Sequence, residues 1–383
     1  MGEFTRLRIP CYDVASIMTL SFPDLLDLIR SKAIRHTQEG AIEPQPASLD
    51  LPLDWSRVHR MPCSILPRPD ESISSIVQRE SLYRVTRDQL LELGHYYLVP
   101  TFVALDLPES ISGNANNKSS SGRINLQSRL LLDGVPLFDT IPPGYCGPLW
   151  VELHPELAPI SLKNPHANLN QIRLREGRHL LSRGDLIAYH EQSPLLYDRE
   201  GHAVAANELH LGADHQSLNV HVDFFSTHGW KGIRRADLPL ELQSHANAAG
   251  KFFEPIAAAN GRLVVNQNDF YILGSLERVS NPLDVCITMR PFDPTHGEFR
   301  SHFAGFFDPG NGSDRSARRP GFVVTMEVIP MESAIQLRHA QPMFAIEIER
   351  LRTPCPAEHA YGKARSSHYH GDDGPRLARW FNP

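Results

Sequence analysis

Six consecutive residues in the first half of the chain carry groups that suit an oligophosphate. They are Lys118, Ser119, Ser120, Ser121, Gly122 and Arg123. Two cations bracket three hydroxyls and a glycine. The hydroxyls and backbone N–H groups can therefore donate to phosphate oxygens, while the glycine allows the backbone to approach closely. The guanidinium of Arg123 can bind phosphate in a bidentate fork. Taken alone, the run is also typical of a polar surface turn, which is the alternative interpretation.

The elements that must position this segment are strand-like. A run Tyr-Tyr-Leu-Val-Pro at residues 96–100 precedes it, and a run Leu-Trp-Val-Glu-Leu at 149–153 follows a turn at 141–145. Proline is abundant throughout, and the apolar runs are short and separated by turn residues. This pattern is typical of an all-β sandwich or barrel.

A few short helices interrupt the strand pattern. Residues 22–32 carry apolar side chains at helical spacing, and Ser21 can cap that helix. Further helices are expected at residues 86–93 and at residues 240–248, where Pro239 stands at the entry.

Composition limits the class of protein. A net charge of -6 gives no general basic footprint, so the sequence predicts no nucleic-acid partner. The five cysteines are scattered and include no Cys-x-x-Cys pair, which indicates a reducing, cytoplasmic location. No apolar run is long enough to span a membrane, so none is expected as a partner.

The order of the motifs resembles the dCTP deaminase branch of the dUTPase superfamily. Residues 45–51 (Gln-Pro-Ala-Ser-Leu-Asp-Leu) fit its first motif, and residues 118–123 fit its phosphate-binding Arg-Ser-Ser motif with Lys for the first Arg. A Pro-Gly turn and a following strand glutamate complete the core pattern. Residues 297–300 and 306–310 resemble the long, duplicated form of the deaminase. The resemblance covers nearly the whole chain.

The two halves of the chain echo each other. The run at residues 96–99 matches Phe-Tyr-Ile-Leu at 270–273, and a Pro-Gly turn precedes the strands of both Glu152 and Glu327. Duplication is the economical explanation, and chance similarity of short strands is the alternative.

We therefore expect a mainly β protein with a few short helices. It should consist of two tandem dUTPase-like β-barrel or jelly-roll domains. The first, at residues 16–185, carries the phosphate motif. The second, at residues 205–383, carries the Asp-Pro-Gly turn, the catalytic glutamate and a C-terminal lid.

The resemblance also implies the chemistry. Zinc-dependent cytosine deaminases carry a Pro-Cys-x-x-Cys signature that this chain lacks, which disfavours zinc. In the other route a carboxylate activates water and then passes the proton to N3 and the leaving amine. The family pattern puts that carboxylate at Glu152 or Glu327. The alternative for each is an outward-facing strand residue.

The halves depart from the family pattern in complementary ways. The first half has Pro142 where the turn aspartate belongs, whereas the second keeps Asp308 but has Phe-Asp-Pro-Thr at residues 292–295 in place of the phosphate motif. Because sites in this superfamily form between neighbouring domains, we expect one hybrid site. Glu327 would be its acid/base, Asp308 would accept from the deoxyribose 3′-hydroxyl, and Glu152 would be structural. Backbone groups of residues 303–305 would read the pyrimidine.

The tail is expected to close over the nucleotide, as it does in the family. Tyr361 and Tyr369 keep the family spacing, but His368 replaces a lysine and Asp372 a glutamine. A disordered terminus is the alternative. The substrate-binding residues that the resemblance implies are thus Lys118, Ser119, Ser120, Ser121, Gly122, Arg123, Ala304, Asp308, Thr325, Tyr361, His368 and Asp372.

The predicted activity is zinc-independent deamination of dCTP to dUTP and ammonia, with Mg²⁺ carried by the triphosphate and no metal held by the protein. A dUTP diphosphatase, a bifunctional enzyme and a non-catalytic nucleotide-binding regulator are the alternatives. Expected partners are dCTP, regulatory dTTP or dUTP, and further copies of the chain, with a trimer favoured over a dimer or a monomer.

Overall fold

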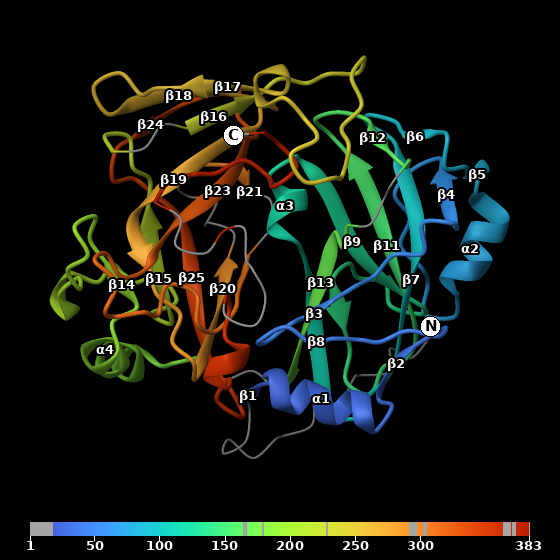
Figure 1. The fold of residues 1–383 in the computed structure, drawn as a ribbon, viewed down its shortest axis with the longest axis horizontal. Helices are drawn as coiled ribbons and strands as arrows, with labels where there is room; N and C mark the ends of the chain where they lie inside the picture. Colours follow the sequence, from blue (N-terminus) through green and yellow to red (C-terminus); the bar gives the residue numbers. More distant parts are fainter. Residues whose placement is uncertain are drawn as a thin grey trace, which may run out of the picture.

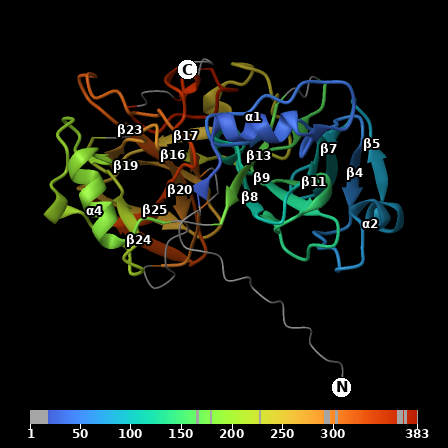
Figure 2. The same ribbon diagram turned by 90° about the horizontal axis from the view of Figure 1, so that it is seen from below.

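Two β-rich halves lie side by side in the molecule (Figure 1). The computed structural model describes residues 18–163, 167–177, 180–226, 229–290, 297–301, 305–362, 369 and 373–382. Each half contains a large hydrophobic core cluster. A view turned by 90° shows the same separation, with helix α1 along one edge near the junction of the halves (Figure 2).

The first half is built on two main sheets. The larger runs in the order β5-β4-β7-β11-β9, with β2 also on β7. Its strands are β2 (Ile34–His36), β4 (Val58–Met61), β5 (Tyr83–Val85), β7 (Tyr96–Asp106), β9 (Leu126–Leu132) and β11 (Cys146–Pro155). The other runs β1-β13-β8-β10, with β3 on β13. Its strands are β1 (Met18–Thr19), β3 (Leu49–Asp50), β8 (Ile111–Asn117), β10 (Thr140–Ile141) and β13 (Asn170–Glu176). A small pair joins β6 (Leu90–Leu91) to β12 (Ile160–Ser161).

The second half repeats this plan. Its larger sheet runs β17-β16-β19-β23-β21, with β14 also on β19. These strands are β14 (Leu196–Tyr197), β16 (Gly229–Gly232), β17 (Phe253–Ile256), β19 (Tyr271–Val279), β21 (Phe299–Ser301) and β23 (Phe322–Pro330). The other sheet runs β15-β25-β20-β22. It contains β15 (Ser217–His221), β20 (Val285–Arg290), β22 (Phe306–Phe307) and β25 (Pro342–Arg350), and the small pair is β18 (Arg262–Asn266) with β24 (Ala334–Arg338).

The register of the strands confirms the tandem arrangement residue by residue. Glu152 on β11 lies opposite Leu98 of β7, and Glu327 on β23 lies opposite Ile272 of β19. The residue before each partner is a buried tyrosine whose hydroxyl accepts a backbone N–H five residues upstream, at 2.8 Å in the first half and 3.1 Å in the second. Glu152 and Glu327 therefore occupy equivalent positions.

One predicted helix is confirmed and two are wrong. Helix α1 (Phe22–Arg30) begins after Ser21, whose backbone N–H donates to Asp24 Oδ2 at 3.0 Å. Residues 86–93 instead form a turn and strand β6, which pairs with β12. Residues 240–248 are held in an irregular conformation because the side chain of Asn247 hydrogen-bonds both the N–H and the C=O of Glu241, at 3.0 and 2.8 Å. Helices α2 (Ile73–Glu80) and α4 (Arg183–Gln192) were not expected.

The end of the chain is part of a core, contrary to its polar appearance in the sequence. Trp380 and Phe381 are only 1% and 4% exposed, and they join a hydrophobic cluster to which both halves contribute. The Phe381 ring lies 5.7 Å from that of Phe252 and 5.2 Å from that of Phe253. In the part of the chain that is described, no helix has the length and apolar character needed to cross a membrane.

Candidate active site

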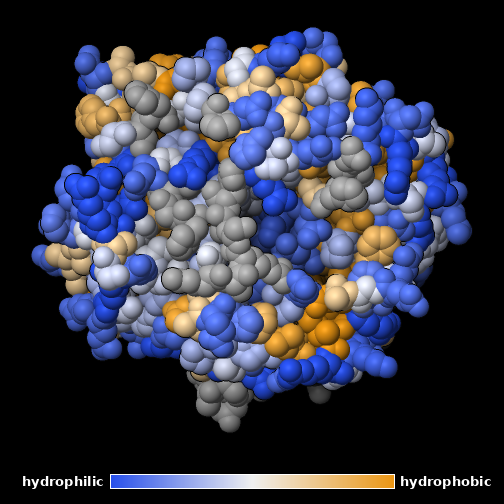
Figure 3. Space-filling model, in the orientation of Figure 1, coloured by the Kyte–Doolittle hydropathy of each residue, from blue (hydrophilic) through white to orange (hydrophobic). Residues whose placement is uncertain are grey.

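A polar cavity of about 690 Å³ opens where the two halves meet. Figure 3 shows it as a hydrophilic hollow near the middle of one face. The first half contributes Asp50, Lys118, Ser119, Ser120, Arg123, Asn168 and Gln171 to its lining. The second half contributes Phe306, Phe307, Asp308, Asn311, Phe322, Val323, Thr325 and Glu327, and the tail adds Tyr361, Tyr369 and Arg379. The arrangement combines both halves of one chain, as expected for a hybrid site.

The predicted phosphate segment forms a one-turn helix, α3 (Ser119–Gly122), directly after β8. Lys118, Ser119, Ser120 and Arg123 line the cavity. Ser121 and Gly122 are buried behind them, and the Ser121 hydroxyl donates to the carbonyl oxygens of Lys118 and Leu169 at 2.8 and 2.7 Å. An exposed surface turn is therefore the wrong interpretation. The two buried residues shape the segment from behind.

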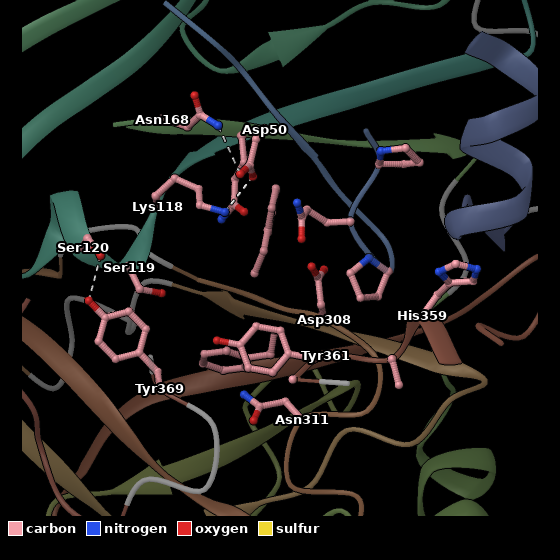
Figure 4. Close-up of a pocket in the computed structure, with 18 of the residues that line it drawn as sticks. Asp50, Lys118, Ser119, Ser120, Asn168, Asp308, Asn311, His359, Tyr361 and Tyr369 are labelled. Atoms are coloured by element: carbon pink, nitrogen blue, oxygen red, sulfur yellow. Dashed lines mark hydrogen bonds and ion pairs between the residues drawn. The ribbon is translucent and has the colours of Figure 1, made fainter. Parts of the chain in front are cut away.

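Lys118 is held at the cavity wall by an acid that sequence reasoning did not single out. Its Nζ lies 2.6 Å from Asp50 Oδ1, and Asn168 donates to the other oxygen of Asp50 at 3.4 Å (Figure 4). Asp50 belongs to the motif at residues 45–51, so its position in that motif was the available signal. The ion pair with Asp50 therefore holds the ammonium group of Lys118 at a defined position on the cavity wall.

Arg123 lies beside Glu327, deep in the cavity. Its Nε is 3.9 Å from Glu327 Oε1, and its side chain is only 8% exposed. The guanidinium carbon sits 3.8 Å from the ring centre of Tyr369, and Nη1 donates to the carbonyl of Arg376 at 3.0 Å. The geometry thus gives Arg123 a direct electrostatic influence on the buried acid.

Glu327 combines burial, an altered pKa and an uncommitted oxygen. Burial raises the pKa of Glu327 to about 8, although the positive charge of Arg123 works in the opposite direction. Its Oε2 has no hydrogen-bond partner within the described residues, and the same holds for Thr325 Oγ1 and Asn311 Oδ1. Buried polar atoms are usually satisfied, so three such atoms lining one cavity indicate a place for a polar ligand or water.

Asp308 is fixed from two directions. Ser48 Oγ donates to its Oδ2 at 3.0 Å, and Arg173 Nη2 donates to its Oδ1 at 3.1 Å. Burial raises the pKa of Asp308, while the charges of Arg173 and Lys118 oppose that rise. Sequence reasoning missed Arg173. The signal was a charged residue between apolar neighbours in a strand run.

Glu152 does not line the cavity. Ser64 Oγ donates to its Oε1 at 2.9 Å, and burial raises its pKa against that hydrogen bond. The structure therefore separates the two equivalent glutamates. Glu327 faces the shared cavity, whereas Glu152 is bonded within its own half.

Two tail tyrosines reach the cavity, as Figure 4 shows. The Tyr369 hydroxyl lies 2.7 Å from Ser120 Oγ, and the backbone N–H of Tyr361 donates to the Pro309 carbonyl at 2.9 Å. Three predicted site residues, Ala304, His368 and Asp372, lie outside the described residues, as does Phe303. The Gly305 N–H, expected to read a pyrimidine, donates to Asn116 Oδ1 at 3.3 Å.

His359, one member of a histidine-rich tail segment, packs as an aromatic ring. Its ring stacks on Phe22 with centroids 3.7 Å apart. Among the described residues no group of three or more His, Cys, Asp or Glu side chains is placed to hold a metal ion. The neighbouring His368 and His370 lie outside the described residues.

The fold and site define a tandem β-barrel protein whose halves share one polar ligand cavity. Sequence profiles then give the family. Residues 18–178 match the N-terminal domain of 2′-deoxycytidine 5′-triphosphate deaminase (DCD), and residues 182–381 match its C-terminal domain. The chain therefore belongs to the dCTP deaminase family.

A solved structure shows the same likeness. The crystal structure of 2′-deoxycytidine 5′-triphosphate deaminase from Agrobacterium tumefaciens is 30% identical in sequence, with a TM-score of 0.78. The match covers 88% of this chain and 99% of that one. A search of curated protein sequences finds no match.

Proposed function

We propose that this protein converts dCTP and water to dUTP and ammonia without zinc, with Glu327 as the general acid/base. The observation that carries the proposal is a buried glutamate with a pKa of about 8, in a cavity whose wall also carries Lys118 and Ser119. A catalytic acid/base works best when its pKa lies near the operating pH. Membership of the dCTP deaminase family supports the substrate.

Glu327 would transfer protons in both directions. Its ionised carboxylate takes a proton from water as the oxygen attacks C4 of cytosine. The protonated acid gives that proton to N3, then takes the proton of the new C4 hydroxyl and passes it to the departing amine, so that ammonia leaves and the C4 carbonyl forms. Arg123, 3.9 Å away, stabilises the ionised form, and Thr325 offers an uncommitted hydroxyl on the same strand face.

The other groups of the cavity would bind the rest of the nucleotide. Lys118, Ser119 and Ser120 would meet the triphosphate, which would carry its Mg²⁺ on its own oxygens. Asp308 accepts from the 3′-hydroxyl of the sugar. An ionised carboxylate has about four acceptor positions, and the contacts from Ser48 and Arg173 use two of them.

Product analysis tests the proposal. Purified protein incubated with dCTP and Mg²⁺ should release ammonia and leave a triphosphate, dUTP, on chromatography. A zinc-selective chelator should not reduce the rate. Pyrophosphate release would indicate a diphosphatase, and tight dCTP binding without turnover would indicate a regulator. Loss of activity with the chelator, restored by zinc alone, would rule out the carboxylate mechanism. Cytoplasmic location, assembly of several chains and regulation by dTTP or dUTP stay predictions.

A further inference from the structure

Arg173 joins the two halves at the back of the cavity. It lies on β13 of the first half and is fully buried, with 0% of its side chain exposed. Its guanidinium makes five hydrogen bonds, to Ala47 O at 3.1 Å, Ile287 O at 3.0 Å, Thr288 Oγ1 at 2.9 Å, Phe307 O at 3.2 Å and Asp308 Oδ1 at 3.1 Å. Four of these acceptors belong to the second half. A buried charge is tolerated only when it is paired and hydrogen-bonded in this way.

The contacts converge on the turn that carries Asp308. Arg173 holds both the main-chain carbonyl of Phe307 and the carboxylate of Asp308, and its guanidinium carbon stacks 4.3 Å from the ring centre of Phe306. These three consecutive residues line the cavity. One side chain of the first half thus sets both the backbone and the side-chain position of a cavity wall in the second.

Comparison of the two repeated halves shows why the ion pair of Arg173 and Asp308 has no counterpart at the equivalent positions. Arg173 faces Asn114 of β8, and the equivalent residue of the second half, Glu347, faces Thr288 of β20. By the same register Ile141 corresponds to Phe307, so Pro142 corresponds to Asp308. The symmetry-related partners would be Glu347 and Pro142, which form neither an ion pair nor a hydrogen bond between side chains. The first half supplies Arg173 and the second half supplies Asp308. The equivalent pair with the halves exchanged cannot form, because proline has no polar side-chain group.

We propose that Arg173 is a positioning residue, which holds Asp308 so that its carboxylate selects nucleotides with a sugar 3′-hydroxyl. The proposal rests on the proposed function and deepens it. Without the arginine, the buried carboxylate would lose the partner that favours its ionised form and the donor that fixes its orientation. An ionised and oriented carboxylate makes a stronger hydrogen bond to a hydroxyl than a neutral carboxyl group does.

The test compares two substrates that differ by one hydroxyl. The kcat/KM ratio of dCTP to 2′,3′-dideoxy-CTP is measured for the parent protein, Asp308→Asn, Arg173→Lys and the double variant. Asp308→Asn should lower the ratio on the order of tenfold, as expected for one charge-assisted hydrogen bond. Arg173→Lys should lower it comparably, through a smaller kcat/KM for dCTP with that for the dideoxynucleotide nearly unchanged. The double variant should match Asp308→Asn, because both changes act through one interaction.

Arg175→Lys is the matched control. Arg175 lies on the same strand and also bridges the halves, through Glu349 Oε1 at 3.2 Å, but it does not line the cavity. The kcat/KM ratio of dCTP to 2′,3′-dideoxy-CTP for Arg175→Lys should equal that of the parent protein. If Arg173→Lys does not fold, Thr288→Val removes one acceptor of the guanidinium and should lower the ratio in part.

The outcomes separate two kinds of failure. Equal losses for both substrates in Arg173→Lys, or an unchanged ratio in Thr288→Val, would make the arginine merely structural and overturn the inference alone. A parent-like ratio in Asp308→Asn would show that Asp308 does not bind the 3′-hydroxyl. That result would overturn the inference together with the proposed role of Asp308.

Discussion

Two glutamates at equivalent positions of a repeat have different surroundings. Glu327 faces the shared cavity with one oxygen uncommitted among the described residues, whereas Glu152 accepts from Ser64. Glu327→Gln should lower kcat at least about a hundredfold with dCTP binding retained, because the amide keeps the shape but cannot take a proton. Steady-state kinetics measures this, with Glu152→Gln as the matched control that stays within a few fold. The reverse pattern would assign the chemistry to the first half.

The pKa of Glu327 predicts a pH profile for catalysis. Since the ionised form accepts the proton from water, kcat/KM should rise about tenfold per pH unit at low pH and level off above about 8. Arg123 lowers that pKa, so Arg123→Gln should move the rising limb to higher pH. Initial rates across pH 6 to 10 check both. A flat profile would contradict the assignment of Glu327 as the base.

The same residue should make stability depend on pH. Its pKa is about 8 in the folded protein and near the ordinary 4.5 in the unfolded chain. Between these values the folded state holds a proton that the unfolded chain has released. Glu327 therefore lowers the unfolding free energy by at most about 1.4 kcal/mol per unit as pH rises. Glutamine has no such proton, so Glu327→Gln should gain stability relative to the parent from pH 5 to pH 8. Urea unfolding measures the difference, and a constant value would contradict it.

At the scale of elements, the tail has two roles. Tyr361 and Tyr369 reach the cavity, but Trp380 is 1% exposed in a core. Trp380→Ala should therefore lower the unfolding free energy by about 3–5 kcal/mol, the usual cost of emptying a buried aromatic site. Leu137→Ala, at a side chain 56% exposed, is the control and should change it by less than about 0.5 kcal/mol. If Trp380→Ala and Leu137→Ala changed the unfolding free energy by equally small amounts, the end of the tail would not contribute to the core.

Local patterns predicted some elements and tertiary contacts decided others. Helix α1 was predictable because Ser21 and Asp24 cap it locally. Residues 240–248 look helical by composition, but Asn247 takes up the backbone groups of Glu241. Lys118, Ser120, Arg123, Asp308 and Glu327 were predicted from the order of the motifs, and the structure places all five around one cavity. Arg173 and Asp50 escaped notice because their importance comes from partners 135 and 68 positions away.

At the scale of the molecule, the two halves contribute different polar groups to one cavity, which is what the predicted hybrid site requires. Lys118 and Arg123 come from the first half and Asp308 and Glu327 from the second, around one cavity. Calorimetry with dCTP and the Glu327→Gln variant, which prevents turnover, should give one nucleotide bound per chain. Two per chain would mean that the Glu152 region also binds substrate.

The burial of Trp380 and Phe381 in the core that contains Phe252 and Phe253 has a consequence for biosynthesis. Translation delivers Phe252 and Phe253 long before these two side chains, yet both phenylalanine rings lie against Phe381. Domains usually fold in order as they leave the ribosome. Here the part of the core around Phe252 and Phe253 is completed only after the last codons have been read. A nascent chain stalled shortly before its end would expose apolar surface to chaperones and proteases, even though nearly all of both repeats had been made.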